Sequence, residues 1–321
     1  MLLRVTHETV YDYVPPVKNA QHMAHLKPLN GAHQQLLQHS LTISPQPAQQ
    51  TEAVDLYGNT RAFFNLPAAH DALHVVAHSL VQTQPAEPPP ASLPWEQVRE
   101  RMRYQRGAAY DAATEFTFPS PYVPRHDDFV AYARPSFAAD RPLLEAARDL
   151  MERIHHDFTY ESQATDINTP ALEALAMRKG VCQDFAHIMI ACLRGMGLPA
   201  RYVSGYLLTE PPPGQPRLVG SDASHAWVSV WSPARDGGGR WCDLDPTNNR
   251  SGWGTPGDEY VILALGRDFS DVSPMRGVIH GGARHTLTVA VTVQPMNEPA
   301  PPHEDVGEQP ADGEPAPPPT H

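Results

Sequence analysis

Cys182 is the residue whose type and position best fit a chemical role. It follows Gly180 and Val181 and precedes apolar residues at helical spacing, which predicts a helix over residues 182–196. A thiol in the first turn of a helix lies near backbone N–H groups that have no partner within the helix. The field of those groups favours the thiolate, the nucleophilic form of cysteine. A cysteine at a helix start can equally be a small core residue, so Cys182 needs partners before a role follows.

The other two cysteines, Cys192 and Cys242, fit positions in the core. Cys192 lies on the apolar stripe of the 182–196 helix, and Cys242 falls on the presumed buried face of a strand. A set of three cysteines does not resemble a disulfide framework and favours a reducing compartment.

A thiolate nucleophile needs a base and a group that orients the base, and one hairpin could supply both. Strands over 225–232 and 239–247 flank a turn-rich segment, and folding them back symmetrically places His225 opposite residue 247. Asp245 is closer to that point than Asp243, although both point to the same face. Register alone therefore leaves both aspartates open. A hydrogen bond from Asp245 to one imidazole nitrogen would leave the other nitrogen facing Cys182.

The elements around these residues predict an α+β domain. Helical periodicity is present over 141–155, 170–179 and 182–196. Strand-forming segments then follow, so helices come first and a run of antiparallel strands second. These strand segments are 201–208, 225–232, 239–247, 259–266 and 284–295.

The N-terminal region predicts a separate β domain. Short alternating segments with turn signals between them suggest a small β-sandwich-like fold, and the proline-rich stretch 85–94 suggests a linker. The last residues are rich in proline and acidic side chains, for which we expect disorder. The predicted organisation is a β-rich domain at 1–84, a linker and connecting segment at 85–136, a catalytic domain with C-terminal strands at 137–296 and an acidic tail at 297–321.

Charge and hydropathy exclude some classes of protein. The net charge of −12 argues against a nucleic-acid-binding surface as the main function, although six acids of the 297–321 tail supply half of it. The N-terminus lacks the apolar core of a signal peptide, and no apolar run approaches the ~18 residues of a membrane span. We therefore expect a cytoplasmic protein with no membrane partner.

Three segments resemble the catalytic blocks of the transglutaminase-like superfamily: GVCQDFAH (180–187), SHAWV (224–228) and LDPTNN (244–249). The similarity is greatest to the bacterial transglutaminase-like proteins, which are often described as cysteine proteases, and it extends over residues 1–295. It implies a papain-like core with Cys182 as nucleophile, His225 as base and Asp245 as the orienting group. Animal transglutaminases have a tryptophan directly after the cysteine, whereas Gln183 stands here, which weakens the inference of strict cross-linking activity.

The groups that would stabilise an oxyanion are less well defined by the sequence. The backbone N–H of Cys182 is a natural first donor, and the hydroxyl of Tyr160 is our candidate for the second. His187 falls on another side of the helix and fits a structural role. Asp184 could cap the helix or contact substrate.

The expected reaction is attack of the Cys182 thiolate on a peptide or glutamine-type amide, giving a thioester acyl-enzyme. Hydrolysis of that thioester is favoured over transfer to an amine, because nothing in the sequence marks an amine-acceptor site. The partner would be a peptide or protein substrate, and no cofactor is expected.

Three alternatives remain from the sequence. The chain could be a true cross-linking transglutaminase, or its N-terminal domain could be a binding module beside an inert core. A metalloenzyme is less well supported, since no cysteine or carboxylate stands at ligand spacing beside the candidate histidines, which are His22, His25, His70, His74 and His78.

Overall fold

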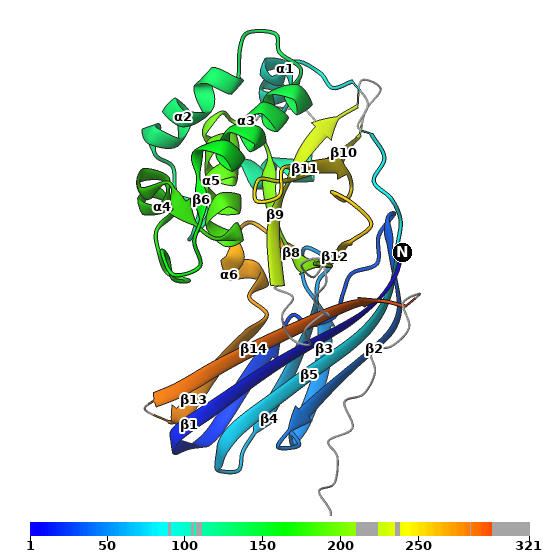
Figure 1. Ribbon diagram of the computed structural model, residues 1–321, viewed down its shortest axis with the longest axis vertical. Coiled ribbons are helices and arrows are strands. Elements are labelled where there is room, and N and C mark those ends of the chain that lie inside the picture. Colours follow the sequence, from blue (N-terminus) through cyan, green and yellow to red (C-terminus); the bar gives the residue numbers. More distant parts are fainter. Residues whose placement is uncertain are drawn as a thin grey trace, which may run out of the picture.

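The computed structural model describes residues 1–88, 91–103, 106, 111–209, 224–234, 238–282 and 284–296. The chain forms an all-β part and a mixed helix-and-sheet part. In Figure 1 the all-β part lies at the bottom and the mixed part at the top. The predicted tail over 297–321 lies outside the described residues. In the part of the chain that is described, no helix is long and apolar enough to cross a membrane.

The all-β part is built around one long strand, β1 (Leu2–Ala24). Its first half pairs with β5 and β14, and its second half pairs with β4 and β13, all antiparallel. β2 continues the sheet beyond β5, and β3 continues it beyond β4. The bounds of the partner strands are β2 (Gln34–Ser44), β3 (Gln49–Val54), β4 (Thr60–Leu66), β5 (His70–Thr83), β13 (Met275–Gly281) and β14 (Arg284–Pro295).

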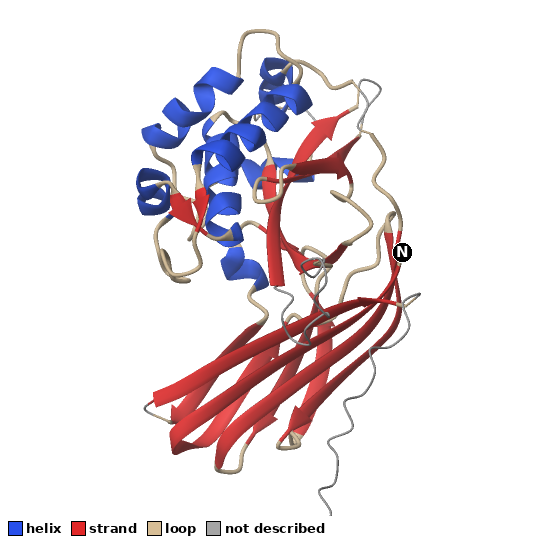
Figure 2. Cartoon of the chain, in the orientation of Figure 1, coloured by secondary structure: helices blue, strands red, loops and turns tan. Residues whose placement is uncertain are grey.

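The strands form two layers (Figure 2), and β1 belongs to both, since its two halves pair with different strands. The β1–β5 pairing shifts register between Asp12 and Val17, where β1 passes from one group of strands to the other. Alternate residues of both groups point into a common interior, as the period of two in a strand requires. This confirms the predicted β-sandwich-like N-terminal domain. Its shared core includes Ile43, Leu73 and Val75 from one layer and Ala62, Phe64 and Leu66 from the other.

The two last strands differ from the predicted grouping. We assigned residues 275–295 to the catalytic domain, but β13 and β14 both pair with β1 in the all-β part. Without them, both halves of β1 would present a free edge of unpaired N–H and C=O groups. Alternation in the sequence predicts that these residues form strands, but it does not encode which distant strand they join.

The mixed part is a sheet of order β11-β10-β9-β8-β12 with helices packed on it (Figure 2). The strands are β8 (Ala200–Leu207), β9 (Ser224–Pro233), β10 (Gly239–Asp245), β11 (Arg250–Trp253) and β12 (Tyr260–Gly266). The helices are α1 (Trp95–Arg101), α2 (Asp127–Ala133), α3 (Leu143–Asp157), α4 (Ala171–Met177), α5 (Cys182–Gly195) and α6 (Phe269–Val272). Short pieces complete it: two 3-10 helices (Ala112–Thr117 and Arg134–Ser136) and a parallel pair, β6 (Thr159–Tyr160) with β7 (Lys179–Gly180).

Helix α5 is the centre of this part. Residues 184–194 are all buried, which explains why apolar side chains occur almost all round the helix. The core around it also takes in Trp95, Val98 and Phe129, which belong to the predicted connecting segment 85–136. That segment is therefore partly integral to the core. Its helices are short, so their periodicity is weak in the sequence.

The two parts meet along the edge strand β12. The side-chain amide of Gln34 bonds the backbone C=O of Ile262 at 2.8 Å and its N–H at 2.6 Å. Asn59 makes the same pair of bonds to Leu265, at 2.7 and 2.8 Å. These amides satisfy backbone groups that an edge strand leaves unpaired. An apolar cluster completes the interface, with Leu3, Val5, Val81, Val291 and Val293 against Tyr206, Val261 and Leu263.

Candidate active site

Cys182 is the first residue of α5, as the sequence predicted, and it is half-buried. The helix start is held by Asp184, whose Oδ2 accepts hydrogen bonds from the backbone N–H of Val181 at 2.9 Å and the Thr165 hydroxyl at 2.7 Å. Asp184 therefore caps the helix. A Cβ on Gly180 would lie 2.5 Å from that oxygen, so only glycine allows the carboxylate to reach this position.

His225 at the start of β9 is hydrogen-bonded to Cys182 on one side and to Asp245 on the other. Its Nε2 lies 2.7 Å from Asp245 Oδ2, which leaves Nδ1 as the ring nitrogen for the thiol. Burial disfavours the charged imidazole, but the charge and hydrogen bond of Asp245, with those of Cys182, outweigh burial and raise the pKa of His225 to about 10. The site therefore favours a protonated imidazole at neutral pH.

Asp245 is fully buried at the end of β10 and accepts several hydrogen bonds. Besides His225, the Tyr260 hydroxyl and Asn248 Nδ2 each donate to Oδ2 at 2.8 Å, and the backbone N–H of Thr247 donates to Oδ1 at 2.9 Å. Burial alone would raise the pKa of this carboxyl, but the charge of His225 and these hydrogen bonds lower it. Asp245 is thus held as a carboxylate in one orientation.

Asp243, the alternative that register left open, has a different partner. Its Oδ2 accepts a hydrogen bond from Trp227 Nε1 at 3.0 Å, and Trp227 in turn stacks on His225 with ring centroids 5.9 Å apart. The predicted hairpin register is correct, since Gly239 pairs with Pro233 and Leu244 with Val228. Asp243 therefore acts on the imidazole of His225 indirectly, through the ring of Trp227.

Tyr160 lies in β6, beside the start of α5, with 54% of its side chain exposed. Its ring packs edge-on against Phe185 at 6.4 Å. Partial burial and then the nearby charge of Cys182 raise the pKa of its hydroxyl. No described residue forms a hydrogen bond with that hydroxyl, which leaves it available to a bound molecule.

The residues expected to be structural lie in the interior. Cys192 and Cys242 are buried, and burial raises the pKa of both thiols, that of Cys242 to about 12. His187 is also buried, stacked on the ring of Tyr122 and in tilted contact with that of Tyr202. Its Nε2 accepts a hydrogen bond from the backbone N–H of Phe269 at 3.2 Å. Burial lowers the pKa of His187 to about 3, so it stays neutral.

Two partners of Asp245 were missed in the sequence. Asn248 belongs to the LDPTNN segment, where we considered only the aspartate. Tyr260 is the first residue of β12, which is an edge strand separated from β10 by β9 and β8. Nothing in the sequence around Tyr260 marks it as a hydrogen-bond partner of Asp245. Among the described residues, no group of three or more His, Cys, Asp or Glu side chains could hold a metal ion.

Comparison with known proteins assigns both parts of the chain. Residues 3–82 match the bacterial transglutaminase-like N-terminal region, and residues 130–246 match the transglutaminase-like superfamily core. An uncharacterized protein of Mycobacterium tuberculosis is 42% identical over 299 residues, 91% of this chain and 92% of that protein. A protein-glutamine gamma-glutamyltransferase of Pseudomonas aeruginosa is 34% identical over 102 residues, 30% of this chain and 15% of that protein.

One solved structure has the same fold over nearly the whole length. It is a "Putative Cysteine Protease from Cytophaga hutchinsonii", which aligns with a TM-score of 0.69 over 94% of this chain and 93% of its own, at 20% identity. The likeness therefore covers the sandwich-like domain as well as the core. Together with the two matched regions and the mycobacterial relative, it shows that this chain belongs to the transglutaminase-like superfamily, among bacterial proteins with a β-rich N-terminal region.

Proposed function

We propose that the chain is a cysteine-dependent acyl-transfer enzyme acting on peptide or glutamine-type amides. In this proposal Cys182 is the nucleophile, His225 carries the proton and Asp245 orients the imidazole. The observation that carries it is the continuous series of contacts from the helix-start thiol through His225 to Asp245, the last of them 2.7 Å long. Superfamily membership supports a cysteine-dependent enzyme.

The proposed reaction has two steps. The Cys182 thiolate attacks the amide carbonyl carbon, forming a C–S bond. The C–N bond then breaks as the leaving nitrogen takes a proton from His225, which releases an amine or ammonia. In the second step water attacks the thioester while His225 accepts its proton. The C–O bond forms, the C–S bond breaks, and the thiolate facing a protonated His225 is restored.

We propose hydrolysis as the main outcome of the second step. The chain has three lysines, and two of them are ion-paired, Lys27 with Glu52 and Lys179 with Glu161. Few lysines are therefore available as amine acceptors, which argues against cross-linking of this chain to itself. The name of the Pseudomonas aeruginosa relative supports the second candidate, transfer of a glutamine acyl group to an amine.

The test is to incubate the purified chain with a glutamine-containing peptide, with and without a primary amine, and to follow ammonia and peptide mass. Hydrolysis predicts ammonia release with conversion of glutamine to glutamate, or cleavage of the peptide bond, in both mixtures. Transfer predicts that the mass of the amine appears on the peptide. No turnover of any peptide by freshly reduced protein would contradict the proposal and favour the binding-module alternative.

We also propose that the Tyr160 hydroxyl donates a hydrogen bond to the developing oxyanion. Tyr160→Phe removes only this donor, so kcat should fall about 10- to 100-fold while KM changes little. Steady-state kinetics on a peptide substrate measures both constants. Tyr11→Phe, a half-buried tyrosine of the sandwich domain, is the matched control and should leave them unchanged. Full kcat in the Tyr160 variant would remove this residue from the proposal.

A further inference from the structure

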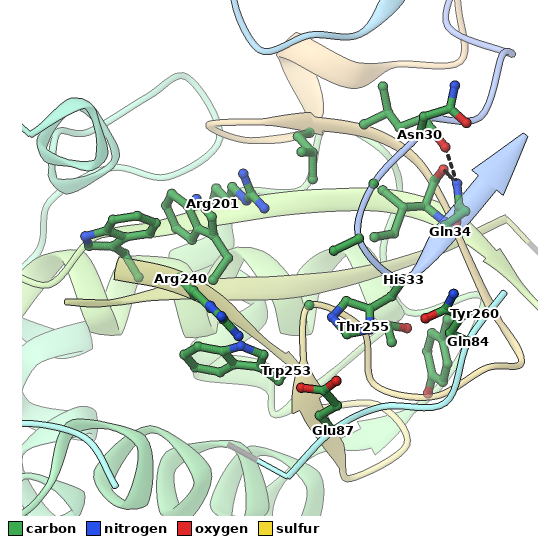
Figure 3. A pocket seen from close by; sticks show the side chains of 18 of the residues that line it. Asn30, His33, Gln34, Gln84, Glu87, Arg201, Arg240, Trp253, Thr255 and Tyr260 are labelled. Carbon is green, nitrogen blue, oxygen red and sulfur yellow. Dashed lines mark hydrogen bonds between the residues drawn. The ribbon is translucent and has the colours of Figure 1, made fainter. Parts of the chain in front are cut away.

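A cavity of about 600 Å³ lies between the two parts of the chain, and neither Cys182 nor His225 lines it. The loop over residues 29–34, with Gln84 and Glu87, forms one side, and β8 to β12 form the other (Figure 3). Tyr260 belongs to its wall, and the hydroxyl of this residue is the one that bonds Asp245. Its volume is that of sites that take small organic molecules.

Two arginines of the sheet line this cavity, and Figure 3 shows them across from His33 and Gln84. Arg201 of β8 is mostly enclosed, and its Nε is buried without a hydrogen-bond partner. Arg240 of β10 is exposed. Neither guanidinium forms an ion pair with a carboxylate of the described residues. Because both charges lack an ion-pair partner in the described part of the chain, a negatively charged ligand that accepts hydrogen bonds from these guanidinium groups would be stabilised in the cavity.

The remaining wall is aromatic. The guanidinium of Arg201 lies 4.1 Å from the centre of the Trp241 ring, and that of Arg240 lies 5.8 Å from the centre of Trp253. Trp231 packs against Trp241 at 5.3 Å and also lines the cavity. Stacking fixes the planes of the guanidinium groups and surrounds them with apolar surface. Such a wall suits a ligand with an apolar group beside its charge.

The charges in and around the cavity favour a singly charged anion. Arg201 and Arg240 carry two positive charges, while Glu87 also lines the cavity and the charge of Asp243 acts on Arg201. Burial lowers the pKa of Arg201 to about 10, which still leaves it charged at neutral pH. A group with two negative charges would meet more repulsion from Glu87 than a group with one.

We propose that this cavity binds a carboxylate attached to an apolar side chain, as at the free C-terminus of a peptide. Arg201 and Arg240 would hold the carboxylate, and the tryptophans would cover the side chain. Cys182 does not line the cavity, so binding there does not require the thiol.

The test uses N-acetylphenylalanine and N-acetylleucine, each compared with its uncharged amide by isothermal titration calorimetry on the full chain. We expect each acid to bind with a Kd at least about tenfold lower than that of its amide. Arg201→Gln and Arg240→Gln should each weaken binding of the acids about tenfold or more. Arg240 is exposed, so its variant should fold normally even if replacement of the enclosed Arg201 does not.

Two controls separate this proposal from other effects. Arg103→Gln, an arginine with 70% of its side chain exposed outside the cavity, should bind like wild type, and so should Cys182→Ala. Equal binding of acids and amides, or wild-type affinity in folded Arg240→Gln, would overturn the proposal. Absence of saturable binding up to about 10 mM, or displacement of the acids by equimolar inorganic phosphate, would overturn it as well.

Discussion

Replacement of Cys182 by alanine is expected to reduce amide turnover by at least about 1,000-fold while leaving the fold intact. No neighbouring group can replace the thiolate in the proposed reaction, because the other two cysteines are buried in the core. Alanine is compatible with the first position of α5, where the Asp184 cap does not involve the thiol. Peptide turnover and thermal unfolding of the same preparation measure the two effects.

Cys192→Ala is the matched control, since it removes a thiol from the same helix. Cys192 is fully buried among apolar side chains, so this variant should unfold at a lower temperature, with about 1 kcal/mol less stability, yet keep its activity per folded molecule. Iodoacetamide should label Cys182 much faster than Cys192 or Cys242 in wild type. Turnover that survives Cys182→Ala, or equal labelling of all three cysteines, would contradict the assignment of the nucleophile.

Residues close together in the sequence account for most of what could be predicted. The apolar stripe defined the helix of Cys182, and the symmetry of the 225–247 hairpin gave the register that the strands adopt. Both features depend on contacts within one helix or between adjacent strands, which periodicity and turn signals encode. His225 and Asp245 could therefore be brought together before any tertiary information was available.

Long-range contacts account for what could not be predicted. Tyr260 reaches Asp245 from β12, and β13 with β14 crosses back to the first strand of the chain. The cavity at Arg201 likewise needs the loop over 29–34 from the other part. Each is decided by how two independently patterned regions pack together, for which a single sequence contains no periodic signal.

Asp245→Asn is expected to lower kcat by about 100- to 10,000-fold, whereas Asp243→Asn should change it less than about threefold. The two residues are both buried on β10, two positions apart, so each variant controls for the other. An amide at 245 removes the charge that keeps His225 protonated and offers the imidazole a donor as well as an acceptor. An amide at 243 can still accept the hydrogen bond of Trp227.

The pH dependence distinguishes loss of this charge from general damage. The pKa of His225 is raised from 6.5 to about 10, so its contribution to stability is complete below pH 6.5 and is lost as the pH rises through about 10. The pKa of Asp245 is lowered from 3.8, so its contribution is present above that value and is lost as the pH falls through the folded pKa. The stability difference between wild type and Asp245→Asn should therefore be largest between pH 3.8 and 6.5.

Residual activity of Asp245→Asn should show its alkaline limit at lower pH than wild type, because the imidazole loses its proton more easily without the carboxylate. Denaturant unfolding across pH 3 to 10, together with kcat/KM profiles, measures both consequences. An unshifted alkaline limit would mean that Asp245 does not control the protonation of His225. If Asp243→Asn instead shifted this limit and lost activity, the roles of the two aspartates would be reversed.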